Sequence, residues 1–220
     1  MTGFEPATLR TQSGCASKLR HIPVRTIVVV TGQTWCMTIP GGDDLMARII
    51  ATLRSREPAC GRTRVLAIDG PSGSGKTTFA ERIAGRSGAT VLHLEDLYRG
   101  WYGLESAPPA AAHVLASIAT AQIGRTPRWD WENDTTGADI TIAPTDLLIV
   151  EGVGAGARSI APFTNLLIWI DGDEPTRKER ALARDGEVYA PWWDTWARQE
   201  REHFVRESTA TRAELRLRID

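Results

Sequence analysis

The chain has 220 residues, 42% of them hydrophobic and 24% charged, and its formal net charge is -1 at pH 7. This balance is typical of one soluble α/β domain with a full core, and it excludes the strong basic charge with which many proteins attract nucleic acid. The apolar run Ile27–Val30 is far shorter than the roughly 20 residues that cross a bilayer. We therefore expect neither a nucleic-acid nor a membrane partner.

The three cysteines, Cys15, Cys36 and Cys60, are odd in number and form no C-x-x-C motif. No histidine stands near them at the spacing of a metal site. A disulfide framework or a zinc site is therefore not expected, and a reducing cytoplasm suits this cysteine content best.

Residues 1–36 have no helical periodicity and little strand pattern. The GFEP tetrapeptide at residues 3–6 can be encoded by GGA-TTC-GAA-CCN, the reverse complement of the T-arm of a transfer RNA gene. We interpret residues 1–36 as a spurious extension or, as the plainer alternative, a disordered tail. The functional domain is then 37–220 and starts at Met37, with Met46 as the alternative start.

Strand and helix signals alternate along the rest of the chain. Four short apolar runs predict buried parallel strands, and a fifth, in which arginine alternates with apolar residues, predicts an exposed edge strand that could pair with another copy of the chain. This alternation indicates an α/β fold with a five-stranded parallel sheet, helices on both faces and a small lid near 177–196. The expected strands are Arg64–Asp69, Thr90–Leu94, Leu147–Val150, Leu166–Ile170 and, at the edge, Leu215–Ile219, and the expected helices are 43–56, Lys76–Arg86, Ala110–Gln122 and Pro175–Arg184.

Residues 70–77 match the phosphate-binding pattern G-x-x-x-x-G-K-[ST] in full, between a predicted strand and a predicted helix. Glycines let such a loop turn its N–H groups toward phosphate oxygens, and the helix adds its positive N-terminal end. The motif predicts a P-loop NTPase that binds ATP with Mg²⁺, with lysine on the outer phosphates and a threonine hydroxyl on the metal. The expected nucleotide-binding residues are Gly70, Ser72, Gly73, Ser74, Gly75, Lys76, Thr77 and Thr78.

Glu151 directly follows the apolar run Leu147–Val150. In open parallel sheets, ligands bind at the carboxyl ends of the strands, so this carboxylate is expected to share the Mg²⁺ site with Thr77. The alternative is that Glu151 only caps a strand facing solvent.

From about Arg64 to its end, the chain resembles the uridine kinase-like branch of P-loop kinases. Besides the P-loop, the LHLEDLY segment is similar to a family strand that ends in an acidic residue shortly before an aromatic one. The resemblance implies that the acidic residue is the catalytic base toward a substrate hydroxyl and helps to place Mg²⁺. Spacing to Tyr98 favours Glu95 for this role and residue type favours Asp96; we take Asp96 as the base, with Glu95 as the alternative.

Two further segments carry the resemblance. The RWDW segment is similar to a nucleoside-contacting segment, which implies substrate contacts from Arg128 and Asp130, although Glu132 and Asn133 follow where the family has histidine and arginine. The alternative is that its two tryptophans pack under a loop. The EGV segment that starts at Glu151 is similar to the family's Glu-Gly-Ile.

The lid near 177–196 also carries the resemblance. The resemblance implies that Arg180 or Arg184 neutralises charge on the transferring phosphoryl group. The alternative is an exposed basic helix face paired with neighbouring glutamates. The aromatic residues that follow differ from the family, and aromatic faces suit a planar or apolar acceptor. The expected acceptor pocket consists of Tyr98, Trp101, Trp192 and Trp193 together with Arg128 and Asp130.

The motifs together predict a kinase that moves the γ-phosphoryl group of ATP to a hydroxyl of a small molecule, for which a nucleoside is one candidate. One alternative is a nucleoside monophosphate kinase, in which Arg99, Arg125 and Arg128 would grip the acceptor phosphate. A second alternative is a non-catalytic ATP-binding protein.

Overall fold

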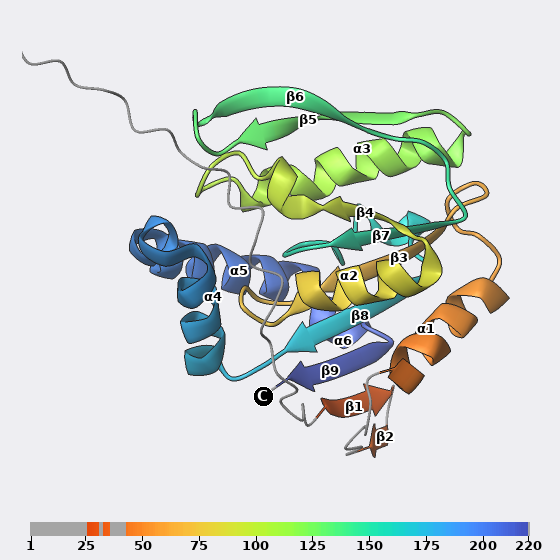
Figure 1. Ribbon diagram of the computed structural model, residues 1–220, viewed down its shortest axis with the longest axis horizontal. Coiled ribbons are helices and arrows are strands. Elements are labelled where there is room, and N and C mark those ends of the chain that lie inside the picture. The colour runs from red at the N-terminus through yellow and green to blue at the C-terminus, as the bar shows by residue number, and fades with distance from the viewer. Residues whose placement is uncertain (1–25, 31–32, 36–42, 220) are drawn as a thin grey trace, which may run out of the picture.

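The computed structural model describes residues 26–30, 33–35 and 43–219. Its main sheet has the strand order β2-β1-β9-β8-β3-β7-β4 (Figure 1). The five strands from β9 to β4 run parallel, so the predicted five-stranded parallel sheet is confirmed. These strands are β3 (Arg64–Asp69), β4 (Thr90–His93), β7 (Leu147–Glu151), β8 (Leu166–Asp171) and β9 (Leu215–Ile219).

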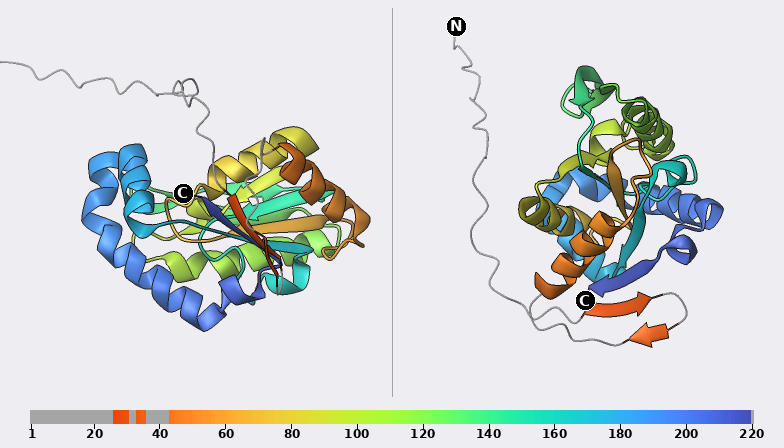
Figure 2. Two further views of the ribbon diagram at one scale, coloured as in Figure 1. Left: turned by 90° about the horizontal axis from the view of Figure 1, so that it is seen from below. Right: turned by 90° about the vertical axis from the view of Figure 1, so that its right-hand side faces the viewer.

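The central strands are apolar on both sides because helices cover both faces of the sheet (Figure 2). Helices α1 (Asp43–Ser55) and α2 (Lys76–Ser87) pack on the face that carries Leu66 and Ile68 of β3. The opposite face is covered by α3 (Ala107–Ala119), α5 (Trp193–Glu207) and α6 (Thr209–Arg212). Helix α3 begins earlier than predicted because a proline occupies its first turn, where the missing N–H is tolerated.

The prediction that residues 215–219 form an exposed edge strand is wrong. Strand β1 (Thr26–Val30) pairs antiparallel with β9, and β2 (Gln33–Trp35) pairs with β1, so the free N–H and C=O groups of β9 are satisfied by a neighbour. Of the segment 1–36, the structure describes 26–30 and 33–35; the remainder of that segment and the expected start at Met37 lie outside the described residues.

Two additions complete the fold: an antiparallel hairpin and a helical lid. Strands β5 (Gly124–Asp130) and β6 (Thr135–Ile142), which the sequence did not predict, form a hairpin that lies against α3 (Figure 1). The lid consists of α4 (Glu174–Tyr189), the short turn η4 (Ala190–Trp192) and the start of α5. Within the described ranges, no helix is long and apolar enough to cross a membrane. Single 3₁₀ turns complete the chain: η1 (Leu94–Leu97), η2 (Leu104–Ser106) and η3 (Ala161–Phe163).

Candidate active site

The phosphate-binding motif forms the turn between β3 and α2, as its sequence context predicts. Gly70, Gly73 and Gly75 have φ angles of 146°, 76° and 88°, a region that side chains disfavour. Space is also missing: a Cβ atom on Gly70 would lie 1.9 Å from the carbonyl oxygen of Ile170, and one on Gly73 would lie 2.1 Å from that of Arg177. The loop is therefore packed tightly enough that only glycine fits at both positions.

Asp69, at the end of β3, anchors the loop from inside the protein. Its fully buried carboxylate accepts hydrogen bonds from the backbone N–H groups of Gly70 (2.7 Å), Gly154 (2.9 Å) and Gly156 (2.8 Å). Burial raises the pKa of this carboxyl, and the three N–H donors oppose the rise. The sequence analysis missed this role, although an acidic residue that ends a strand beside the motif was a visible signal.

Lys76 lies inside the phosphate-binding turn with 7% of its surface exposed. Its Nζ donates to the carbonyl oxygen of Pro71 at 2.9 Å. Burial lowers the pKa of the ammonium, whereas the carboxylate of Glu151 opposes that effect. The buried hydroxyl of Ser74 has no hydrogen-bond partner among the described residues. An ammonium and an unpartnered hydroxyl in a cradle of glycines fit a triphosphate.

Thr77 and Glu151, predicted as metal ligands from distant segments, are brought together. The Thr77 hydroxyl lies 3.3 Å from each carboxylate oxygen of Glu151. Glu151 is 3% exposed and also bonds His93 Nδ1 at 2.6 Å, because His93 and Glu151 are register partners on β4 and β7. This bond raises the pKa of His93. A hydroxyl and a carboxylate beside the lysine form a donor set that suits Mg²⁺.

The neighbouring acidic residues Glu95 and Asp96 face different partners. The Glu95 side chain keeps contact with solvent, yet protein atoms around its carboxyl desolvate it enough to raise its pKa. Its main charged neighbour is the guanidinium of Arg184, which opposes that rise. Asp96 instead forms a two-point ion pair with Arg128, with both N–O distances at 3.2 Å. Asp96 is thus tied to the β5–β6 hairpin, whereas the charge that acts most on Glu95 is that of Arg184 in the lid.

The aromatic residues predicted as an acceptor pocket are packed against one another. Trp101 stacks on Tyr189 and Trp192, with ring centroids 5.2 Å and 5.9 Å away and interplanar angles of 13° and 8°. Trp193 is buried and tilted against Tyr189, at 5.6 Å. Tyr98 is also buried, and its hydroxyl donates to the carbonyl oxygen of Val153. These rings join the lid to the loop that follows η1 as a compact aromatic cluster.

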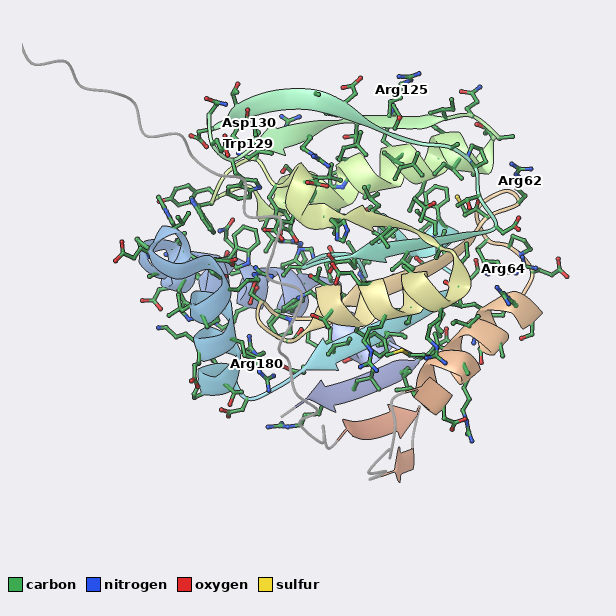
Figure 3. All side chains as sticks on the ribbon, in the orientation of Figure 1. Arg62, Arg64, Arg125, Trp129, Asp130 and Arg180 are labelled. Carbon is green, nitrogen blue, oxygen red and sulfur yellow. The ribbon has the colours of Figure 1, made fainter. Side chains whose placement is uncertain are left out.

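The β5–β6 hairpin carries the other two predicted acceptor contacts. Asp130 is near the hairpin tip, and its oxygens accept from the backbone N–H groups of Glu132 and Asn133 (Figure 3). It therefore caps the hairpin turn. Arg128 reaches back to Asp96 and, together with Arg99, lines a cavity of about 40 Å³ beside α3. Arg125 extends from the outer side of the hairpin (Figure 3).

The three lid arginines on α4 have different surroundings. Arg177 is 9% exposed, and its Nη1 donates to the carbonyl oxygen of Ser72 at 3.0 Å. Arg180 lies on the same helix (Figure 3). Arg184 makes two hydrogen bonds to the adjacent Asp185, at 2.7 Å and 2.6 Å, which raise its pKa. Arg184 is therefore a fixed cation near Glu95.

Helix α5, whose start belongs to the lid, also contacts the phosphate-binding turn. Glu200 of α5 is 4% exposed, and its Oε1 accepts from the backbone N–H of Ser72 at 2.8 Å. The indole N–H of Trp196 lies 2.9 Å from the same oxygen and 3.0 Å from the Ser72 hydroxyl. Sequence analysis missed Glu200 because it is one of several glutamates in a charged segment. Thr78, by contrast, is exposed on the first turn of α2.

No protein-family model matches the chain, and a search of curated proteins finds no match either. Solved structures do match. A possible uridine kinase from Bacillus stearothermophilus is 21% identical with a TM-score of 0.56, and the alignment covers 79% of this chain and 97% of the other. A protein provisionally described as a fructose transport system kinase from Silicibacter sp. TM1040 is 17% identical with a TM-score of 0.53, and 73% and 88% are covered. The chain therefore shares the α/β fold of these two structures.

Proposed function

We propose that the chain is an ATP-dependent phosphotransferase that phosphorylates a hydroxyl of a small molecule. The observation that carries this proposal is the convergence of three groups from separate elements: Lys76 in its glycine cradle, Thr77 on α2 and Glu151 on β7. Such a turn with a hydroxyl and a carboxylate beside it is the arrangement that phosphoryl transfer needs for its phosphates and its metal.

Each residue has a physical task in this proposal. Lys76 and the N–H groups of the turn hold the phosphates, and Thr77 and Glu151 hold Mg²⁺. When bound, the metal neutralises phosphate charge and the nucleotide supplies the phosphoryl group. Glu95 accepts the proton of the acceptor hydroxyl, because its raised pKa suits a base and because Asp96, the other candidate, is paired with Arg128. Arg184 adds positive charge next to it.

Product analysis by mass spectrometry tests the proposal. The full chain is incubated with ATP, Mg²⁺ and a panel of nucleosides, nucleoside monophosphates, sugars and hydroxy acids. A phosphorylated product that disappears with Lys76→Ala supports a kinase and names the class of acceptor. ATP binding without any phosphorylated product across the panel would instead favour the non-catalytic ATP-binding protein.

The nucleoside monophosphate kinase is a second candidate. Arg99 and Arg128 line the cavity beside α3, and two guanidinium groups suit an acceptor phosphate. A cavity of about 40 Å³ is far below the ~300 Å³ of an ordinary small-molecule site, so the hairpin would have to move to admit a nucleotide. Product formed only from the monophosphates of the panel would decide for this candidate.

A further inference from the structure

The phosphate-binding turn contains an acidic contact that the proposed chemistry does not use. Glu200 projects from α5 and binds the backbone N–H of Ser72, which lies inside the P-loop motif. Backbone N–H groups of this motif are the donors that ordinarily receive phosphate oxygens. A carboxylate oxygen therefore occupies one of the anion-binding donors of the turn.

The position of Glu200 is closely defined by its surroundings. The residue is 4% exposed, and its Oε1 also accepts from the indole of Trp196 at 2.9 Å. The same indole lies 3.0 Å from the Ser72 hydroxyl, so helix α5 holds both the backbone and the side chain of Ser72. The charge of Glu200 moreover acts together with those of Glu151 and Asp69 against the fall in the pKa of Lys76 that burial causes. The negative charge of Glu200 thus acts both on the backbone N–H of Ser72 and on the ammonium of Lys76, and both groups are expected to bind phosphate.

Resting on the proposed ATP binding, we infer that Glu200 is an internal competitor of the nucleotide phosphates. Its carboxylate and a phosphate oxygen compete for the N–H group of Ser72 and for the positive charge of Lys76. Entry of the triphosphate requires the carboxylate to leave Ser72. Because Glu200 belongs to α5, that release also breaks one of the two contacts that hold α5 to the turn, so Glu200 is a positioning residue that couples nucleotide binding to the lid.

The competition makes a prediction that depends on ligand charge. Glu200→Gln keeps an oxygen that can accept from Ser72 and removes only the negative charge. Calorimetric titration should show ATP binding about tenfold tighter, since a single charge a few ångström from an anion changes affinity on that order in a partly desolvated site. ADP should gain less, and adenosine should bind unchanged because it carries no phosphate.

A matched control is available on the same helix. Glu202 of α5 is exposed, so Glu202→Gln removes the same charge without touching the turn, and all three ligands should bind as they do to the wild type. Unchanged or weaker ATP binding by Glu200→Gln would overturn the inference. An equal gain for adenosine and ATP would overturn it as well, because that result indicates a purely structural role.

Two further measurements separate the possible failures. Trp196→Phe keeps an aromatic ring but removes the indole donor that holds Glu200, so it should also tighten ATP binding, and it carries the test if Glu200→Gln does not fold. Wild-type ATP binding that is lost in Lys76→Ala tests the proposed function by itself. If Glu200→Gln binds ATP and the wild type does not, the competition is supported. If neither the wild type nor any variant binds ATP, both the competition and the proposed function are overturned.

Discussion

Buried carboxylates gather around the phosphate-binding turn, and each is stabilised by different donors. Asp69 accepts three backbone N–H groups, Glu151 bonds a histidine and a threonine, and Glu200 bonds one amide and one indole. Buried carboxylates with complete hydrogen bonding hold their partners in place, and removal of either partner leaves a buried charged or polar group without its hydrogen bond. The candidate site is therefore sensitive to single substitutions that would be harmless at the surface.

The identity of the base can be tested by two conservative substitutions. Glu95→Gln should lower kcat by about 10²-fold or more while ATP affinity is retained, because general base catalysis contributes on that order. Asp96→Asn should have a smaller effect on kcat, since Asp96 is paired with Arg128. A larger loss with Asp96→Asn in steady-state kinetics would restore Asp96 as the base, the choice made from residue type alone.

The same assignment predicts a pH dependence. Desolvation raises the pKa of Glu95 above its ordinary value of 4.5, and a base acts only when it is deprotonated. Activity should therefore be present above the raised pKa and lost as the pH falls through it. The pH profile of kcat should lose this acid limb in Glu95→Gln, and an unchanged limb would show that another group titrates.

The glycines of the turn can be tested against a glycine elsewhere. Gly73→Ala should lower the free energy of unfolding by at least ~1–3 kcal/mol, because the φ angle of 76° strains a side chain and the new Cβ would overlap the Arg177 carbonyl. Gly85 lies inside α2 with no atom near its missing Cβ, so Gly85→Ala should raise that free energy by roughly 0.5–1 kcal/mol. Urea unfolding of both variants provides the comparison.

Among the elements, those with a local pattern could be predicted from sequence. The apolar strands β3, β7 and β8 are buried on both faces, which leaves the continuous apolar runs that identified them. The P-loop was equally visible because each fixed position of its motif has its own backbone or side-chain requirement. The juxtaposition of Thr77 and Glu151 followed from the rule that parallel strands end at one edge.

The hairpin and helix α5 could not be predicted in this way. Strands β5 and β6 are mostly exposed, so they lack an apolar alternation, and a proline within β5 argued against a strand. Helix α5 begins next to a dense group of tryptophans that favoured a binding flap. Its contact between Glu200 and Ser72 joins residues 128 positions apart, and no local signal marks one glutamate among several as the partner of a backbone amide.

Helix α4 contains a built-in break that can be tested. Gly186 has φ 59° and ψ -139°, a conformation that is open to glycine and closed to most other residues. Gly186→Ala should cost about 1–3 kcal/mol of stability or straighten the helix, although no atom lies within 4 Å of the added Cβ. Either response displaces Tyr189 and Trp192, so kcat should fall more than in Gly85→Ala; equal activities would show that the break has no part in lid function.

For the whole molecule, the antiparallel addition at the β9 edge is a further feature that the sequence did not predict. β1 continues the sheet, yet the five parallel strands, their helices and the P-loop are formed by residues 43–219. Deletion of residues 1–36 should therefore leave folding and activity intact, with at most a modest drop in Tm as the β9 edge becomes exposed. A chain that starts at Met37 and unfolds, or loses turnover, would show that the β1 pairing is required.

The stacked rings of the lid have an optical consequence. Trp101 lies nearly parallel to Tyr189 and to Trp192, and Trp196 stands edge-on to it at 6.4 Å. Chromophores held at such distances in a fixed chiral arrangement couple their electronic transitions and give intense bands in near-ultraviolet circular dichroism, which vanish when packing loosens. The intensity of these circular dichroism bands therefore reports, without any added label, whether the lid, the loop and α5 are packed together around a ligand.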